Sequence, residues 1–221
     1  FRHGRSADGR SVGGDHGTID FIEPRTGDTI EFRDGNRRFR QLRPHAKGGL
    51  GIVYLADDLE LPREVALKEI QERYADNPES RARFVREAEI TGALEHPGIV
   101  PVYGLGRYGD GRPYYAMRFI RGDSLKEVIA AFHAADSRPD RDPGERAMSL
   151  RKMLGRFIDV CDALEYAHSQ GILHRDLKPG NIMVGKYGET VVVDWGLAKN
   201  LAKADSGDPS NDQAVRIRSS S

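Results

Sequence analysis

Polar side chains stand among apolar runs in the stretch from Gly171 to Gly196, and their types suit catalysis. Asp176, Lys178 and Asn181 fall within the run H-R-D-L-K-P-G-N, and Asp194 follows three valines. A carboxylate can accept a proton, and carboxylate and amide oxygens are ligands that Mg²⁺ prefers. We therefore expect a loop and two short strands that direct these groups into one catalytic cleft.

The run H-R-D-L-K-P-G-N resembles the catalytic loop of protein kinases, and V-V-V-D-W-G resembles their magnesium-binding D-F-G, with Trp195 in the Phe position. The resemblance implies phosphoryl transfer from ATP, which crowds negative charge onto oxygens that already carry it. It implies that Asp176 accepts the proton of the substrate hydroxyl and that Lys178 lies near the transferring group. Asn181 and Asp194 would hold Mg²⁺. Lysine at position 178 is typical of kinases for serine and threonine in proteins, and D-W-G-L-A-K is similar to bacterial members.

Composition limits the other classes of function. The chain has 221 residues, 38% of them hydrophobic and 31% charged, which is ordinary for a globular protein with one large or two small cores. Lys plus Arg equals Asp plus Glu at 34 each, so we expect neither nucleic acid nor an anionic membrane as partner. No apolar run approaches the roughly twenty residues needed to cross a bilayer. We expect a cytoplasmic protein.

A single cysteine, Cys161, excludes an intramolecular disulfide and any zinc site with several cysteines. A reducing compartment is compatible with this count. We expect Cys161 itself to pack in the core.

A glycine-rich turn is predicted between two β-like runs, Phe39 to Leu42 and Gly51 to Ala56. Glycines let the backbone approach phosphates closely and present its N–H groups to them. The kinase pattern is G-x-G-x-x-G-x-V, and this chain departs from it with Ala46 in the first position. A plain hairpin is the alternative. The resemblance implies nucleotide contacts at Ala46, Lys47, Gly48, Gly49, Gly51 and Val53.

A third β-like run, Glu64 to Ile70, contains V-A-L-K, similar to the kinase V-A-I-K, so Lys68 would contact the α- and β-phosphates. A charged lysine in an apolar strand needs an opposite charge. The predicted helix from Pro78 to Leu94 offers Glu87, with Glu89 as the second choice. These two point about 200° apart on a helix, so only one can face the cleft. For either glutamate, a solvated carboxylate is the alternative.

Strands Ile99 to Gly106 and Pro113 to Ile120 would complete a five-stranded small lobe. The resemblance makes Met117 the back of the nucleotide pocket, and Arg118 to Ile120 the hinge whose backbone binds adenine. Val53 and Ala66 would cover adenine from above and Met183 from below. Core packing is the alternative for Met117.

Two helices follow. Ser124 would cap a helix from Leu125 to about Ala135, and a loop from Asp136 to Arg146 would lead to a long helix from Ser149 to Gln170, closed by Gly171. Its core stripe is predicted as Met153, Phe157, Val160, Cys161, Leu164 and Ala167. We expect structural roles for His168 and His174.

The predicted fold is α+β, a two-lobe protein-kinase-like fold with a complete small β-rich lobe and one long helix, plus the first part of the helical large lobe. Residues 1–36 are expected to be a disordered or linker tail, residues 37–120 the small lobe, and residues 121–221 a partial large lobe that ends within the activation segment. The chain begins with Phe1 and lacks the family's A-P-E motif, so we expect a fragment.

Three functions fit the sequence. An active serine/threonine kinase accounts for the whole set of matched residues. A pseudokinase or nucleotide-binding scaffold is suggested by Ala46, Trp195 and the missing segment, and a phosphotransferase for small molecules is the third. Arg175 could pair with a phosphorylated residue downstream of D-W-G, where Ser206, Ser210 and Ser219 to Ser221 lie.

Overall fold

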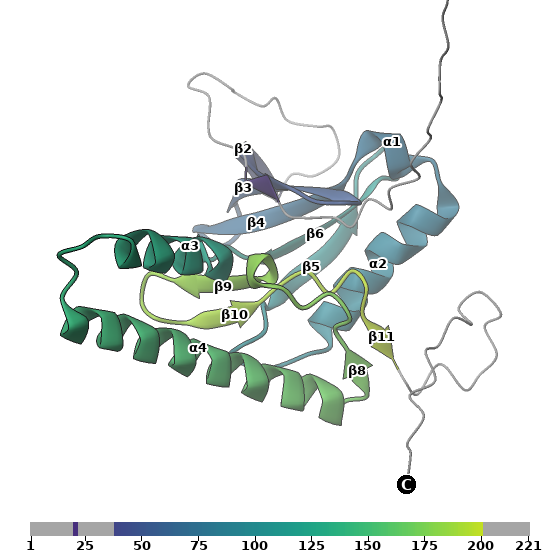
Figure 1. The fold of residues 1–221 in the computed structure, drawn as a ribbon. Helices are drawn as coiled ribbons and strands as arrows, with labels where there is room; N and C mark the ends of the chain where they lie inside the picture. Colours follow the sequence, from purple (N-terminus) through teal and green to yellow (C-terminus); the bar gives the residue numbers. More distant parts are fainter. Residues whose placement is uncertain (1–19, 22–37, 201–221) are drawn as a thin grey trace, which may run out of the picture.

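The computed structural model describes residues 20–21 and 38–200 of the chain (Figure 1). One half is an antiparallel six-stranded sheet with the strand order β1-β2-β3-β4-β6-β5. The strands are β1 (Asp20–Phe21), β2 (Phe39–Lys47), β3 (Gly51–Asp58), β4 (Arg63–Ile70), β5 (Val102–Arg107) and β6 (Pro113–Arg118). Five of them correspond to the predicted small lobe, which confirms the fold class for this half.

The strand β1 was not predicted, since it falls within the expected tail. It pairs with the end of β2, so that Phe21 lies opposite Ala46. The other residues of the tail, and the serines considered for phosphorylation, lie outside the described residues.

Strand β4 lies inside the sheet, between β3 and β6. Because side chains alternate along a strand, its residues pack into different hydrophobic clusters on the two faces of the sheet. Val65 and Leu67 are fully buried in one cluster together with Phe39 and Ala116. Ile70 belongs to a second cluster with residues of α2. Lys68 shares a face with Ile70 by this alternation, so its charge is carried to the side covered by the helix.

Helix α2 (Pro78–Gly92) follows the short helix α1 (Glu72–Ala75) and packs against β5 and β6. Asn77 caps it by accepting a hydrogen bond from the Ser80 N–H at 2.8 Å. Its buried side is mainly apolar, and it also includes Glu87. The residues buried on this side are Phe84, Glu87, Ala88 and Thr91.

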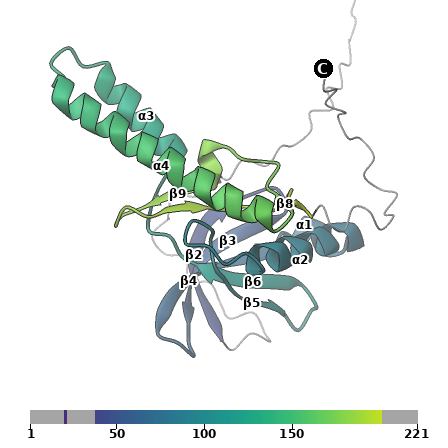
Figure 2. The ribbon, with the colours of Figure 1, turned by 90° about the horizontal axis from the view of Figure 1, so that it is seen from below.

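The other half is mainly helical. It contains β7 (Gly122–Ser124), α3 (Leu125–Asp136), α4 (Pro143–Ser169), β8 (Ile172–Leu173), the 3₁₀ turn Pro179–Asn181, β9 (Ile182–Gly185), β10 (Thr190–Val192) and β11 (Lys199–Asn200). Strands β10, β9 and β7 form one small sheet, and β11 pairs with β8. Helix α4 packs on β10 and β8, on the far side of the hairpin from the large sheet (Figures 1 and 2).

The segment just before β5 contacts the lower half of the fold. This strand begins later than predicted because Ile99 and Val100 pair with β10 instead of β6. Ile99 forms a parallel bridge with Val192, and the Val100 N–H donates to Val192 O at 3.2 Å. The segment 98–100 therefore belongs to the lower half, and Pro101, which has no N–H, separates it from the strand.

Two predictions about α4 are wrong. The helix begins at Pro143 and not at Ser149, because Asp142 caps it by accepting from the Glu145 N–H at 2.8 Å and proline is tolerated in the first turn. Its buried contact is made by Val160, Ala163 and Ala167. Val160 and Ala167 belong to the predicted stripe, and Leu164 packs against the same cluster. Phe157 is 64% exposed and Cys161 is exposed, because β8 and β10 cover only the side that includes Ala163 and Ala167.

Within the described ranges, 20–21 and 38–200, no helix combines the length and apolar character that crossing a bilayer requires.

The predicted cap of α3 is present as a capping box. The Ser124 hydroxyl accepts from the Glu127 N–H at 3.3 Å, and the Glu127 carboxylate accepts from the Ser124 N–H at 2.7 Å. Ser124→Ala should lower the free energy of unfolding by about 1 kcal/mol. Ser137→Ala at the exposed end of the same helix is the control and should change it by less than about 0.5 kcal/mol. Urea denaturation followed by circular dichroism measures both, and equal effects would contradict the capping role.

Candidate active site

A cavity of about 420 Å³ lies between the two halves of the fold. Its upper wall comes from the turn between β2 and β3 and from β4, and its lower wall comes from β9 and the segment after β10. Most of the predicted nucleotide contacts line it, together with the hinge. These are Ala46, Gly48, Gly49, Val53, Ala66, Lys68, Met117, Arg118, Ile120 and Met183. The apolar floor continues into a buried cluster with Val100 and Val191.

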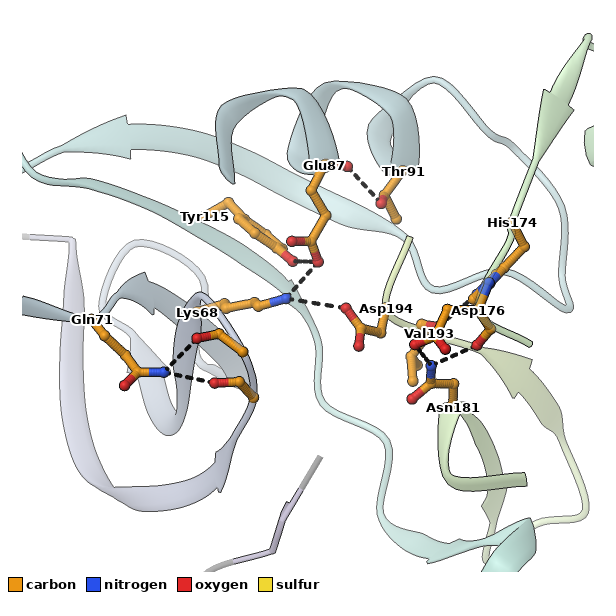
Figure 3. Close-up of polar contacts among 12 residues, drawn as sticks. Lys68, Gln71, Glu87, Thr91, Tyr115, His174, Asp176, Asn181, Val193 and Asp194 are labelled. Carbon is orange, nitrogen blue, oxygen red and sulfur yellow. Dashed lines mark hydrogen bonds and ion pairs between the residues drawn. The ribbon is translucent and has the colours of Figure 1, made fainter. Parts of the chain in front are cut away.

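The centre of the site is a buried ammonium group between two carboxylates (Figure 3). Lys68 Nζ lies 2.5 Å from Glu87 Oε1 and 3.5 Å from Asp194 Oδ1. The Tyr115 hydroxyl donates to the same Glu87 oxygen at 2.8 Å. The predicted ion pair between Lys68 and Glu87 is therefore present, whereas Glu89 is exposed on the other side of α2.

The charge of Lys68 is held by its partners. Burial alone would lower the pKa of this lysine, but Glu87, Tyr115 and Asp194 together raise its pKa well above the ordinary value. Burial and the Glu87 carboxylate also raise the pKa of Tyr115, so its hydroxyl keeps its proton and remains a donor. The site thus presents a permanent positive charge at the inner end of the cleft.

The predicted catalytic loop folds around Asp176. Lys178 Nζ lies 2.8 Å from Asp176 Oδ2. The Asn181 amide donates to the Asp176 backbone oxygen at 2.9 Å and to Oδ2 at 3.2 Å. Asp176 lines the cleft. Lys178 and Asn181 are not among the lining residues, and each contacts the Asp176 carboxylate.

His174 has the structural role that was predicted. Its Nδ1 accepts from the Asp176 N–H at 3.2 Å, so the proton is on Nε2, which donates to Val193 O at 3.1 Å. Burial lowers the pKa of this imidazole, in agreement with the neutral form. The ring packs on Trp195, with centroids 4.6 Å apart. His174 therefore ties the catalytic loop to the segment that carries Asp194.

Backbone strain marks both sides of this contact. Arg175 has φ 67° and Asp194 has φ 61°, and these are the positive φ values found at described residues other than glycine. A side chain in this region costs on the order of 1–3 kcal/mol, which the surrounding contacts must offset. Both residues adjoin groups expected to do chemistry, which is where such strain is commonly found.

The residues expected to hold a divalent cation fit one. Asn181 is 0% exposed, and its side-chain oxygen Oδ1 has no hydrogen-bond partner within the described part of the chain. The Val193 N–H donates to Asn181 O at 2.9 Å, which brings Asn181 beside Asp194. A buried oxygen without a donor, next to a carboxylate, matches the hard ligands of Mg²⁺.

Two predicted nucleotide contacts do not line the cleft. Lys47 is exposed at the end of β2, next to the buried Ala46. Gly51 lies behind Lys68, where a Cβ atom would come within 2.8 Å of Lys68 Cε and 3.1 Å of Glu69 O. The role of Gly51 visible in the fold is therefore to make room for the lysine side chain.

Several residues of the site were missed. Tyr115 could have been found, since it shares a strand face with Met117 two residues on. His45, Arg83 and Thr91 also line the cleft. Gln71 contacts the glycine-rich turn from outside the cleft. Helical spacing places Thr91 on the same face as Phe84 and Ala88, but no sequence pattern marked the other three positions.

Gly51→Ala should displace Lys68 from Glu87 because the added methyl group overlaps the lysine side chain. We expect roughly tenfold weaker binding of MgATP, equal to about 1.4 kcal/mol. Gly104→Ala in β5 is the control, because nothing lies within 4 Å of the methyl group it adds. Calorimetric titration measures both variants, and unchanged affinity of Gly51→Ala would contradict the packing of Lys68 beneath this glycine.

Stability should fall on mild acidification because His174 is neutral in the fold. In the unfolded chain this imidazole takes up a proton below about pH 6.5, which stabilises the unfolded state. Burial also lowers the pKa of His45, which adds to the effect. His174→Gln should therefore reduce, but not abolish, the loss of unfolding free energy between about pH 7 and 5. Exposed His168→Gln is the control, and an unchanged pH profile for His174→Gln would show the assignment wrong.

Residues 40–215 match the protein kinase domain family. The chain is 45% identical over 162 residues, 73% of its length, to "Serine/threonine-protein kinase PknD" of Chlamydia muridarum, of which it covers 17%. It is 44% identical over 182 residues, 82% of its length, to the protein of the same name in Chlamydia caviae, of which it covers 19%. A third relative of that name, from Protochlamydia amoebophila, is 42% identical over 69% of the chain, which covers 15% of that protein.

The chain thus spans less than a fifth of the length of these relatives. The matched family covers both halves of the described fold and both groups of motifs. The chain belongs to the protein kinase domain family, and within it to the bacterial-type serine/threonine kinases.

Proposed function

We propose that this chain transfers the terminal phosphoryl group of ATP to serine or threonine hydroxyls of protein substrates, in signalling. Membership of the family implies ATP as substrate, use of a divalent metal ion and protein substrates. The observation that carries the proposal is the Lys68 ammonium between Glu87 and Asp194, with Asp176 in the same cavity. The reaction needs this combination of a fixed cation and a separate proton acceptor.

ATP would lie along the cleft. Its adenine would bind the backbone of the hinge at Arg118 to Ile120, with Met117 behind it, and would lie between the small lobe and Met183. Lys68 would then meet the α- and β-phosphates at the inner end. The apolar lining and the position of the buried Lys68 ammonium support this direction for the nucleotide.

Asn181 and Asp194 are the residues that would hold Mg²⁺. The buried, unpaired Asn181 Oδ1 supports this assignment. When bound, the ion would neutralise charge on the phosphate oxygens. Since Asp194 also touches Lys68, its orientation in the cleft depends on the ion pair.

Asp176 would accept the proton of the attacking hydroxyl, while the new bond forms to the γ-phosphorus and the bond to the ADP oxygen breaks. Lys178 and Asn181 hold the Asp176 carboxylate by hydrogen bonds, so it is oriented before substrate binds. Lys178 would also provide an ammonium group beside the transferring group, which its contact with Asp176 supports. These contacts support Asp176 as a general base whose carboxylate is already oriented without substrate.

A nucleotide-binding scaffold is the second candidate, since Ala46 and Trp195 depart from the family pattern. Trp195 is almost fully buried, and its indole N–H has no partner among the residues described. Both functions predict ATP binding, but only the kinase predicts turnover.

The cytoplasmic location stays a prediction.

Asp176→Asn separates the two candidates. In the full-length protein it should lower turnover on a serine or threonine peptide by about 10²–10⁴-fold, because the proton acceptor is lost. Affinity for MgATP should change by less than about twofold, because Asp176 acts on the hydroxyl and not on the nucleotide. Lys68→Ala should lower both the turnover and the affinity for MgATP. Transfer of labelled phosphate and calorimetric titration provide the two readouts.

Asp162→Asn, an exposed carboxylate on α4, is the matched control and should behave as the wild type. Wild-type turnover by Asp176→Asn would refute the assigned base. ATP binding without any turnover in the wild type would favour the scaffold.

A further inference from the structure

Gln71 is a buried polar residue that has no role in the proposed reaction as described above. It is 4% exposed and follows directly after β4, the strand that carries Lys68. Its side-chain amide donates to Gly48 O at 2.6 Å and to Gly49 O at 3.0 Å (Figure 3). Its backbone N–H donates to Leu50 O at 2.9 Å. One residue thus binds three consecutive carbonyls of the glycine-rich turn.

These bonds are not explained by the helix that Gln71 precedes. Gln71 occupies the N-cap position of α1, yet its side chain makes no capping hydrogen bond there. Both partners of the amide are carbonyl oxygens, so only the NH₂ group can face them. A residue without a donor at the end of this side chain could not make the two contacts.

The contacts determine how two peptide groups of the turn are oriented. In a planar trans peptide, the carbonyl of one residue and the N–H of the next point in opposite directions. Because the Gly48 and Gly49 carbonyls face Gln71, the N–H groups of Gly49 and Leu50 face away from it. Neither N–H donates to any other residue in the described ranges. Gly48, Gly49 and Leu50 line the cleft, and Gln71 does not.

We propose that Gln71 is a positioning residue that directs the Gly49 and Leu50 N–H groups to the phosphates of the bound nucleotide. This inference depends on the proposed function. A turn with adjacent glycines has many accessible conformations, and only some of them present donors to an anion. The amide of Gln71 restricts these conformations and ties the turn to the strand of Lys68. The donors of the turn and the ammonium group therefore keep a constant relative position.

Gln71→Met in the full-length protein tests this role. Methionine has a similar shape and lacks the amide, so the turn loses its two side-chain hydrogen bonds. Affinity for MgATP should fall roughly tenfold, equal to about 1.4 kcal/mol, while affinity for adenosine, which has no phosphates, should be unchanged. In kinetics, KM for ATP should rise and KM for the peptide substrate should not. A loss of packing alone would not distinguish ATP from adenosine.

Gln41→Met is the matched control. Gln41 lies on β2 and donates to Glu69 and Tyr108 instead of the turn. This variant should reduce stability without a selective loss of MgATP affinity. If Gln71→Met does not fold, Gln71→Asn keeps the donor on a shorter side chain that cannot reach both carbonyls, and the same selective loss is expected.

The outcomes are distinct. A wild-type protein that does not bind MgATP would refute the proposed function. A wild type that binds MgATP, with a Gln71 variant that loses ATP and adenosine affinity equally or loses neither, would overturn the role of Gln71 alone. A selective loss for MgATP supports it.

Discussion

The buried Lys68 ammonium is the interaction on which the rest of the site depends. A charge that is 8% exposed is costly unless it is paired, and its partners come from different elements. Glu87 lies on α2 and Asp194 follows β10, so the pair requires the sheet, the helix and the lower half of the fold to meet at one point. Removal of one partner from such a buried pair typically costs about 3–5 kcal/mol. The ion pairs of Lys68 therefore form only when these elements are packed together, and loss of one partner would destabilise the fold.

The groups of the lower half are positioned by hydrogen bonds between the catalytic loop and the segment that follows β10. His174 links Asp176 to Val193, and Asn181 links the same two segments through its backbone and side chain. This leaves one buried oxygen, on Asn181, without a donor and one carboxylate, on Asp194, on strained backbone. A buried oxygen without a donor beside a carboxylate is typical of a site preorganised for a cation.

The glycine-rich turn must be restrained by contacts with other residues, because its glycines allow many backbone conformations. Its position comes from outside the cleft, where Gln71 binds its carbonyls, and from Gly51, which leaves space for Lys68. The turn, β4 and Lys68 are thus parts of one connected unit. Ala46 in place of the first glycine is compatible with this arrangement, since it is buried and lies opposite Val53 of β3, directly after a register shift between the two strands.

The sequence by itself determined the five main strands and the cap of α3, because these depend on local periodicity and capping residues, and its motifs determined the fold class and the main chemical groups through their resemblance to protein kinases. Helix geometry showed that only one of Glu87 and Glu89 can face the cleft, and the structure shows that it is the first choice, Glu87. Only the tertiary structure decided the contacts between distant segments, such as Gln71 with the turn and Trp195 with His174. It also decided which side of α4 is buried, and there Cys161 and Phe157 were misassigned. An apolar residue on a helix shows that a face can be buried, but the neighbour that covers it is a property of the packed chain.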